Sequence, residues 1–284
     1  MKKLLLSLAA ATASAGAIAS PAIDLPTGPI YLKFTGQEQV ATSGTTFAGT
    51  NEINWGVFII SSMETGDVNT PNDAIDPNGG NFFTNSVKKG EAQITGMFYG
   101  IEAGTNPTKD NPFPGAKGYM DLYWRDLSLL TASSLTKQSG TGPSIRCGFS
   151  CATGFTEGTF LARLYFDTGM DPNSHTNTIV GSQVPSSNGA TGQADSYASV
   201  DMTKQGLWSY ALNSNWFTSA EGQRDLRFKN SYNYNSAWNG KTPNILGFRV
   251  DDPGQAFAVP EPGALSLMGL ALVGMGAVLR RRRG

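Results

Sequence analysis

The sequence is poor in the side chains that most metal and catalytic sites need, with a single histidine, His175, and two cysteines. A zinc site takes four ligands, and one histidine beside two cysteines cannot complete it. No G-x-S-x-G motif marks a serine nucleophile, and no carboxylate pair of the glycosidase kind stands out. We therefore expect no catalytic residue, no metal and no cofactor.

Charged residues are also scarce, at 15% of the chain, whereas glycine (34 residues) and proline (15 residues) are abundant. This composition is unlike that of a coiled coil, a helical bundle or a charged disordered tail. The 21 basic residues are balanced by 22 acidic ones. Without a basic face, the chain is not expected to bind nucleic acid.

The N-terminus has the pattern of a secretory signal peptide. Two lysines follow Met1, an apolar run of small residues continues to Ala19, and Ala17 and Ala19 form a small-x-small cleavage site. The run is short and interrupted by serine and threonine, which disfavours a membrane-spanning anchor. We predict that signal peptidase removes residues 1–19 and that the chain is exported.

The C-terminus combines three features in a fixed order. Pro260, Glu261 and Pro262 come first, an apolar stretch over Gly263–Leu279 follows, and the chain then carries Arg280, Arg281, Arg282 and Arg283. An uncharged stretch of 17 residues is at the short limit for a transmembrane helix. The arginines are expected to stay cytoplasmic by the positive-inside rule. The tail therefore predicts an exported chain that is held in the inner membrane.

These three features resemble the PEP-CTERM sorting signal of Gram-negative bacteria that make exopolysaccharide. The resemblance covers residues 259–284. It implies processing by exosortase, a membrane protease-transpeptidase that recognises the tail and cleaves near the Pro-Glu-Pro motif. It also implies transient anchoring in the inner membrane, followed by transfer to the cell surface or the extracellular matrix. An ordinary tail anchor with a chance Pro-Glu-Pro is the alternative.

The exported region, residues 20–258, is predicted to be one all-β domain, like a β-sandwich or jelly roll. Short apolar or alternating runs recur between clusters of glycine, asparagine, proline and aspartate. The predicted strands are Ile30–Thr35, Ile53–Ser62, Glu91–Ile101, Tyr119–Trp124, Thr159–Phe166, Tyr197–Met202, Leu207–Leu212, Leu226–Tyr232 and Ile245–Val250. A short helix is predicted over Asp126–Leu135.

Four long polar segments are predicted to be loops: Glu64–Asn81, Gly104–Gly118, Gln138–Ser144 and Asp171–Ala194. Part of the first, Asp67–Gly79, is rich in oxygen ligands. It departs from the EF-hand calcium pattern at Ala74 and Asn85, where that pattern has an acid or asparagine and a glutamate. We therefore expect a turn-rich surface loop there.

The two cysteines, Cys147 and Cys151, lie four residues apart in the segment RCGFSC. In an exported protein, such a close pair predicts a disulfide that closes a small loop. The C-x-x-x-C spacing differs from the C-x-x-C spacing of redox-active pairs. We therefore expect this disulfide to shape the local chain.

Aromatic residues are the best candidates for ligand contact, because aromatic faces suit the C–H surfaces of sugar rings. Tyr232, Tyr234 and Trp238 lie in the segment Ser231–Gly240, where asparagine and serine flank the rings. We predict that this segment is an exposed loop and that these three residues are candidate glycan-binding residues. The alternative is that the rings belong to the core, as most tryptophans in such a domain do.

The favoured function is a structural or adhesive one in an exopolysaccharide biofilm or floc. The segment Asn51–Gly56, followed by VFIISSM and later by ITGMFYGI, resembles certain PEP-CTERM proteins associated with flocculation. The first alternative is a carbohydrate-binding module that retains exopolysaccharide. A secreted hydrolase is the less favoured alternative.

Overall fold

The computed structural model describes residues 24–260, except 43, 48, 70–72, 86–91, 127–154, 189–190 and 241. Most of these residues are in β-strands, which confirms the all-β class. The strands are β1 (Gly28–Ala41), β2 (Glu52–Asn69), β3 (Ala74–Thr84), β4 (Ala92–Ala103), β5 (Gly115–Asp126), β6 (Thr159–Asp167), β7 (Asn177–Gly181), β8 (Thr191–Val200), β9 (Phe217–Ser219), β10 (Gly222–Arg224), β11 (Leu226–Tyr234) and β12 (Ile245–Ala258). Two short helical turns, α1 (Ser209–Leu212) and η4 (Ser236–Trp238), lie between them.

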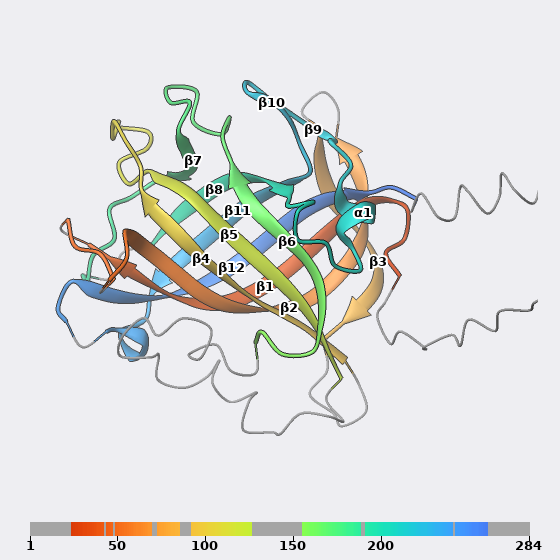
Figure 1. The fold of residues 1–284 in the computed structure, drawn as a ribbon, viewed down its shortest axis with the longest axis horizontal. Helices are drawn as coiled ribbons and strands as arrows, with labels where there is room; N and C mark the ends of the chain where they lie inside the picture. The colour runs from red at the N-terminus through yellow and green to blue at the C-terminus, as the bar shows by residue number, and fades with distance from the viewer. Residues whose placement is uncertain are drawn as a thin grey trace, which may run out of the picture.

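The main sheet is antiparallel and closes on itself. Its strands are tilted, as Figure 1 shows. The order β1-β12-β11-β8-β6-β5-β4-β2 returns to β1, because β1 pairs with β12 on one side and with β2 on the other. Strand β3 pairs with β2, β7 bridges β5 and β8, and β9 and β10 form a separate pair. A single closed sheet around one interior thus takes the place of the two facing sheets of a sandwich.

Alternation along the strands decides which side chains enter the interior. On β6, Ala162, Leu164 and Phe166 are buried, whereas Tyr165 between them is exposed on the outer face. Successive side chains of a strand point to opposite faces, so this pattern is what a sheet with one buried face requires. One face of this strand therefore lines the interior and the other is turned outward.

Phenylalanine rings from several strands fill the interior. The ring of Phe34 on β1 lies 5.8 Å from that of Phe58 on β2 and 6.1 Å from that of Phe228 on β11. Gly96 on β4 makes room for the Phe58 ring, since a Cβ atom there would lie 2.4 Å from this ring. Large rings opposite missing side chains give the dense packing that a stable core needs.

The structure corrects the prediction of a strand over Leu207–Leu212. This segment contains α1, with Trp208, Ala211 and Leu212 buried. Their spacing of three and four residues is that of one face of a helix. In a segment this short, the helical and extended patterns of apolar residues are difficult to separate.

The predicted loop over Glu64–Asn81 is also wrong, because most of it is a β-hairpin. The pairing of β2 with β3 continues from Ser62 opposite Thr84 to Asn69 opposite Ala74, with residues 70–72 outside the description. Polar residues and glycines occupy most of β3, so no apolar alternation marks this strand in the sequence. The predicted loop Asp171–Ala194 also contains a strand, β7. This strand has only five residues, which is too short for a clear pattern in the sequence.

Several predictions concern residues outside the described part of the chain. These are the signal peptide over residues 1–19, the helix after Asp126, the Cys147–Cys151 disulfide and the tail from Glu261 onward. The described structure tests none of them. Among the residues described, no helix combines the length and the apolar character needed to cross a membrane.

Candidate functional site

The aromatic residues singled out in Ser231–Gly240 are largely buried, which corrects the prediction of an exposed loop. The exposed fraction is 6% for Tyr232 and 3% for Trp238. Tyr234 is half-buried, and its hydroxyl oxygen accepts a hydrogen bond from Asn239 Nδ2 at 2.8 Å. Tyr232 and Trp238 therefore belong to the core.

Trp238 is buried because the chain folds back over the sheet after β11. The turn η4 packs against β12 at Gly247, where a Cβ atom would lie 2.3 Å from the carbonyl carbon of Trp238. Gln39 on β1 donates a hydrogen bond from Nε2 to the Trp238 carbonyl oxygen at 2.9 Å. The polar residues that flank this ring in sequence therefore do not indicate whether the ring itself is buried.

Three other tyrosines form a row across the outer face of the sheet. Tyr99 on β4 is directly opposite Tyr119 on β5, which is directly opposite Tyr165 on β6. The exposed fraction is 40% for Tyr119 and 38% for Tyr165. The ring centres of Tyr99 and Tyr119 are 5.9 Å apart. This tyrosine row (Tyr99, Tyr119 and Tyr165) is an aromatic surface that a ligand can reach from outside.

An ion pair supports two of these rings. Arg163 on β6 donates from Nε and Nη2 to the two carboxylate oxygens of Asp121 on β5, at 2.7 and 2.8 Å. The guanidinium carbon lies 5.8 Å from the centre of the Tyr99 ring and 5.4 Å from that of Tyr119. The hydrogen bonds to Asp121 hold the pKa of Arg163 above its ordinary value. The charged arginine therefore stays in place against the two rings.

A groove of about 800 Å³ lies beside the tyrosine row. Tyr119 and Tyr165 line it together with hydroxyl-bearing and charged side chains, namely Thr168, Thr176, Thr178, Thr203, Lys117, Glu102, Asp167 and Asp201. Aromatic rings offer faces to the C–H groups of a sugar, and the polar side chains offer partners to its hydroxyl groups. This combination makes the groove a candidate site for a carbohydrate chain.

The wall of the groove at the start of β5 depends on an unusual backbone. Lys117 has φ of 57° and Gly118 has φ of 103°, both in the left-handed region. A Cβ atom on Gly118 would lie 2.6 Å from Ile101 Cγ1. Lys117 pairs through Nζ with Glu102 at 2.9 Å. A left-handed conformation costs a non-glycine residue about 1–2 kcal/mol. Other interactions of the fold must therefore offset this cost at Lys117.

The carboxylates of the groove already have partners. Asp167 accepts a hydrogen bond from Ser199 Oγ at 2.9 Å and pairs with Arg224 Nε at 3.1 Å. Asp201 accepts a hydrogen bond from the backbone N–H of Thr203 at 2.9 Å. Hydrogen bonds from the side chain and backbone of Thr203 lower the pKa of Asp201. Asp201 is therefore ionised at neutral pH and suited to accept hydrogen bonds from hydroxyl groups.

No metal site accompanies these carboxylates in the described part of the chain, where no three side chains of histidine, cysteine, aspartate or glutamate come together. His175, the one histidine, is exposed and its ring contacts the carboxylate of Glu221. The sequence singled out neither the groove nor its tyrosines as a site.

The chain leaves the closed sheet at the end of β12. Ala258 is paired with Gly28 of β1, and the next backbone N–H, that of Val259, donates to the carbonyl oxygen of Ala211 at 2.8 Å. Pro260 is exposed. The Pro-Glu-Pro segment thus begins two residues after the last paired residue of the sheet.

A family model described as the PEP-CTERM protein-sorting motif matches residues 258–283. The chain ends in an exosortase sorting signal. This confirms the resemblance expected from Pro260, Glu261 and Pro262, the apolar stretch and the arginines. A protein with the PEP-CTERM motif is exported and sorted to the cell surface, and the motif marks it for processing by exosortase. No curated protein and no solved structure matches the chain.

Proposed function

We propose that this PEP-CTERM protein holds exopolysaccharide at the cell surface or in the extracellular matrix, and that it contributes in this way to the cohesion of a biofilm or floc. The groove beside the tyrosine row is the binding site in this proposal. The observation that carries it is the set of three tyrosines in register on adjacent strands, next to threonine hydroxyls and carboxylates.

Binding by one groove is expected to be weak. Each stacked ring contributes about 0.5–1.5 kcal/mol beyond the area that it buries. Many copies of the protein on one polymer would bind much more tightly through avidity. Without residues 1–19 and 259–284, the chain has 15 basic and 21 acidic residues. This negative charge favours a neutral polysaccharide over a strongly acidic one.

The chemistry of the groove supports binding over hydrolysis. A glycosidase uses one carboxyl group whose pKa is raised, so that it can donate a proton to the leaving oxygen. The pKa of Asp201 in the groove is lowered instead. Asp225, whose pKa is raised by burial, is not among the residues that line the groove in the described part of the chain. The lowered pKa of Asp201 therefore favours binding of a sugar chain over its hydrolysis at this groove.

The route to the surface in this proposal follows from the two ends of the chain. Signal peptidase cleaves at the site formed by Ala17 and Ala19, and the apolar stretch Gly263–Leu279 then holds the chain transiently in the inner membrane of a Gram-negative cell. Exosortase acts near Pro260-Glu261-Pro262. Because Pro260 lies two residues beyond Ala258, cleavage there would leave every residue of β12 in the released domain.

Binding to purified exopolysaccharide from the cell that makes this chain tests the proposed site. The full-length protein in detergent is immobilised at high density, and polysaccharide retention is compared between the wild type and the double variant Tyr119→Ala/Tyr165→Ala. We expect the double variant to bind about tenfold more weakly or worse, because two stacked rings are lost.

Tyr210→Ala is the matched control. Tyr210 has an exposed fraction of 45%, similar to those of Tyr119 and Tyr165, but it lies on α1 outside the groove. The control should retain the polysaccharide as the wild type does. Equal retention by the double variant and the wild type would refute the groove as the binding site.

A further inference from the structure

The interior of the closed sheet contains a second feature, a small cavity beneath β7 and the segment after it. A space of about 40 Å³ is lined mainly by apolar side chains, among them Val40, Phe113, Ile179 and Phe248. An adjoining space of about 50 Å³ has several of the same walls, including Glu38, Asn54 and Tyr232. Each is large enough for a few non-hydrogen atoms, since one water molecule needs about 10–15 Å³ by this measure.

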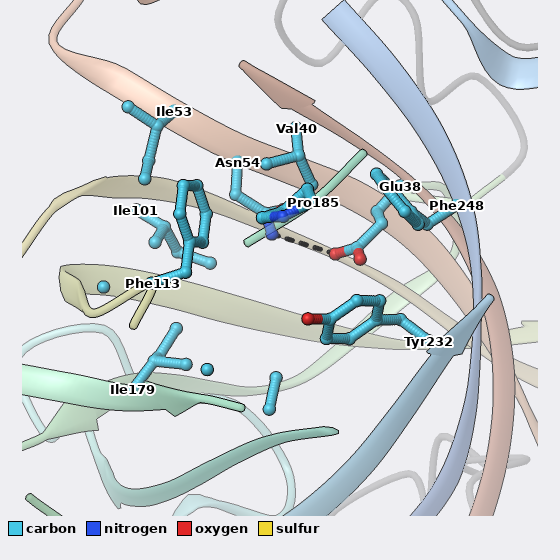
Figure 2. A pocket seen from close by; sticks show the side chains of 13 residues that line it. Glu38, Val40, Ile53, Asn54, Ile101, Phe113, Ile179, Pro185, Tyr232 and Phe248 are labelled. Carbon is cyan, nitrogen blue, oxygen red and sulfur yellow. Dashed lines mark hydrogen bonds between the residues drawn. The ribbon is translucent and has the colours of Figure 1, made fainter. Parts of the chain in front are cut away.

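A carboxyl group lies in these apolar surroundings. Glu38 on β1 has an exposed fraction of 7%, and its Oε2 accepts a hydrogen bond from Asn54 Nδ2 at 2.9 Å. Figure 2 shows the Glu38 carboxyl group and the Tyr232 hydroxyl directed into the same space, across from Phe113 and Ile179. No lysine, arginine or histidine lines either space among the residues described. A buried carboxylate without a cation is costly, so such groups usually have an ionic partner.

The other polar atoms of the cavity that lack a hydrogen-bond partner in the described chain are acceptors as well. The Oδ1 atoms of Asn54 and Asn230 are buried, and neither has a hydrogen-bond partner within the described chain. Both residues line the second space together with Glu38. The hydroxyl of Tyr232 already donates its proton to the carbonyl oxygen of Gln183 at 2.7 Å. The cavity thus offers oxygen acceptors and, in Glu38, a negative charge.

We propose that this cavity binds a small primary amine, with its ammonium group at Glu38 and its short hydrocarbon part against the apolar wall. An ammonium group has three hydrogen-bond donors and one positive charge, which match the acceptors of the cavity and its carboxylate. The size of the two spaces limits the hydrocarbon part to a few carbon atoms. The proposal is independent of the groove, which lies on the outer face of the sheet.

Ligand-observed NMR titration of the full-length protein in detergent, with n-butylamine as the probe, tests this site. At pH 8 the amine is protonated, and Glu38, whose pKa burial raises to about 7, is mostly ionised. n-Butanol serves as the comparison because it has nearly the same size and no charge. We expect the dissociation constant of n-butylamine to be about tenfold lower than that of n-butanol.

Glu38→Gln should weaken n-butylamine binding about tenfold or more and leave n-butanol binding nearly unchanged, because glutamine keeps the size of the side chain and removes its charge. Glu221→Gln is the matched control, since Glu221 is outside the cavity and contacts the exposed His175. It should bind n-butylamine as the wild type does. Equal binding of the two probes, the same affinity in Glu38→Gln, or no binding of n-butylamine to the wild type would each overturn the proposal.

Discussion

Replacing Glu38 with glutamine is expected to stabilise the protein at neutral pH and to have little effect at pH 4. Burial raises the pKa of Glu38 from its ordinary value of 4.5 to about 7, against the opposing effect of the hydrogen bond from Asn54. Between these pH values the unfolded chain loses its proton while the folded chain keeps it. The contribution of Glu38 to stability is therefore fully present below pH 4.5 and is lost as the pH rises to about 7.

The size of this loss follows from the difference between the pKa values of Glu38 in the unfolded and folded chains. This difference corresponds to about 3 kcal/mol. Glutamine at position 38 can still accept the hydrogen bond from Asn54 Nδ2 and does not titrate. The free energy of unfolding of Glu38→Gln, relative to the wild type, should therefore rise by about 3 kcal/mol between pH 4 and pH 8.

Urea unfolding of both proteins at a series of pH values, followed by tryptophan fluorescence, measures this difference. Other groups also make stability depend on pH, since burial raises the pKa of Asp225 and a contact with Lys33 lowers that of Glu64. These contributions are common to both proteins and cancel in the difference. A difference that stays constant from pH 4 to pH 8 would contradict this prediction, because Glu38 would then titrate alike in the folded and unfolded chains.

Three further predictions concern other parts of the chain. Asp121→Asn should lower the free energy of unfolding by about 3 kcal/mol, because it leaves Arg163 without its buried partner; a loss below about 1 kcal/mol in urea unfolding would contradict the role given to this pair. Alanine at Pro260, Glu261 and Pro262 should leave the precursor in the inner membrane in cell fractionation, and a shortened extracellular form would argue against recognition of this motif. Alkylation of the exported, unreduced protein should label neither Cys147 nor Cys151, whereas two labelled thiols would exclude the disulfide.

The positions of most strands could be predicted from the sequence, but the closure of the sheet could not. Alternation marks a strand such as β6, because one of its faces is buried. Closure depends on the pairing of β1 with β2 and with β12. In the second of these pairings, Gly28 is opposite Ala258, although the two residues lie near opposite ends of the described sequence. Nothing local in either strand indicates such a partner. Strand β3 escaped prediction because its residues are mostly polar or glycine and exposed.

The tail motif could be recognised because its features are adjacent in sequence, whereas the groove could not. Tyr99, Tyr119 and Tyr165 come from three strands and become neighbours only through the strand register. The predicted exposure of Trp238 was wrong because it was based on the polar residues beside it in sequence. Packing of η4 at Gly247 buries the ring. A surface site of this kind is recognised only when both the pairing register of the strands and the exposure of the side chains are known.

Binding of exopolysaccharide by the groove is tested most directly by the amount of exopolysaccharide that cells retain when they carry Tyr119→Ala/Tyr165→Ala in place of the wild-type chain. Immunoblotting must first show that the variant is processed and displayed at the wild-type level, since its sorting signal is intact. These cells are expected to retain no more polysaccharide than cells lacking the protein, while cells with Tyr210→Ala retain the wild-type amount. Wild-type retention by cells with the double variant would contradict the claim that the groove holds the polysaccharide.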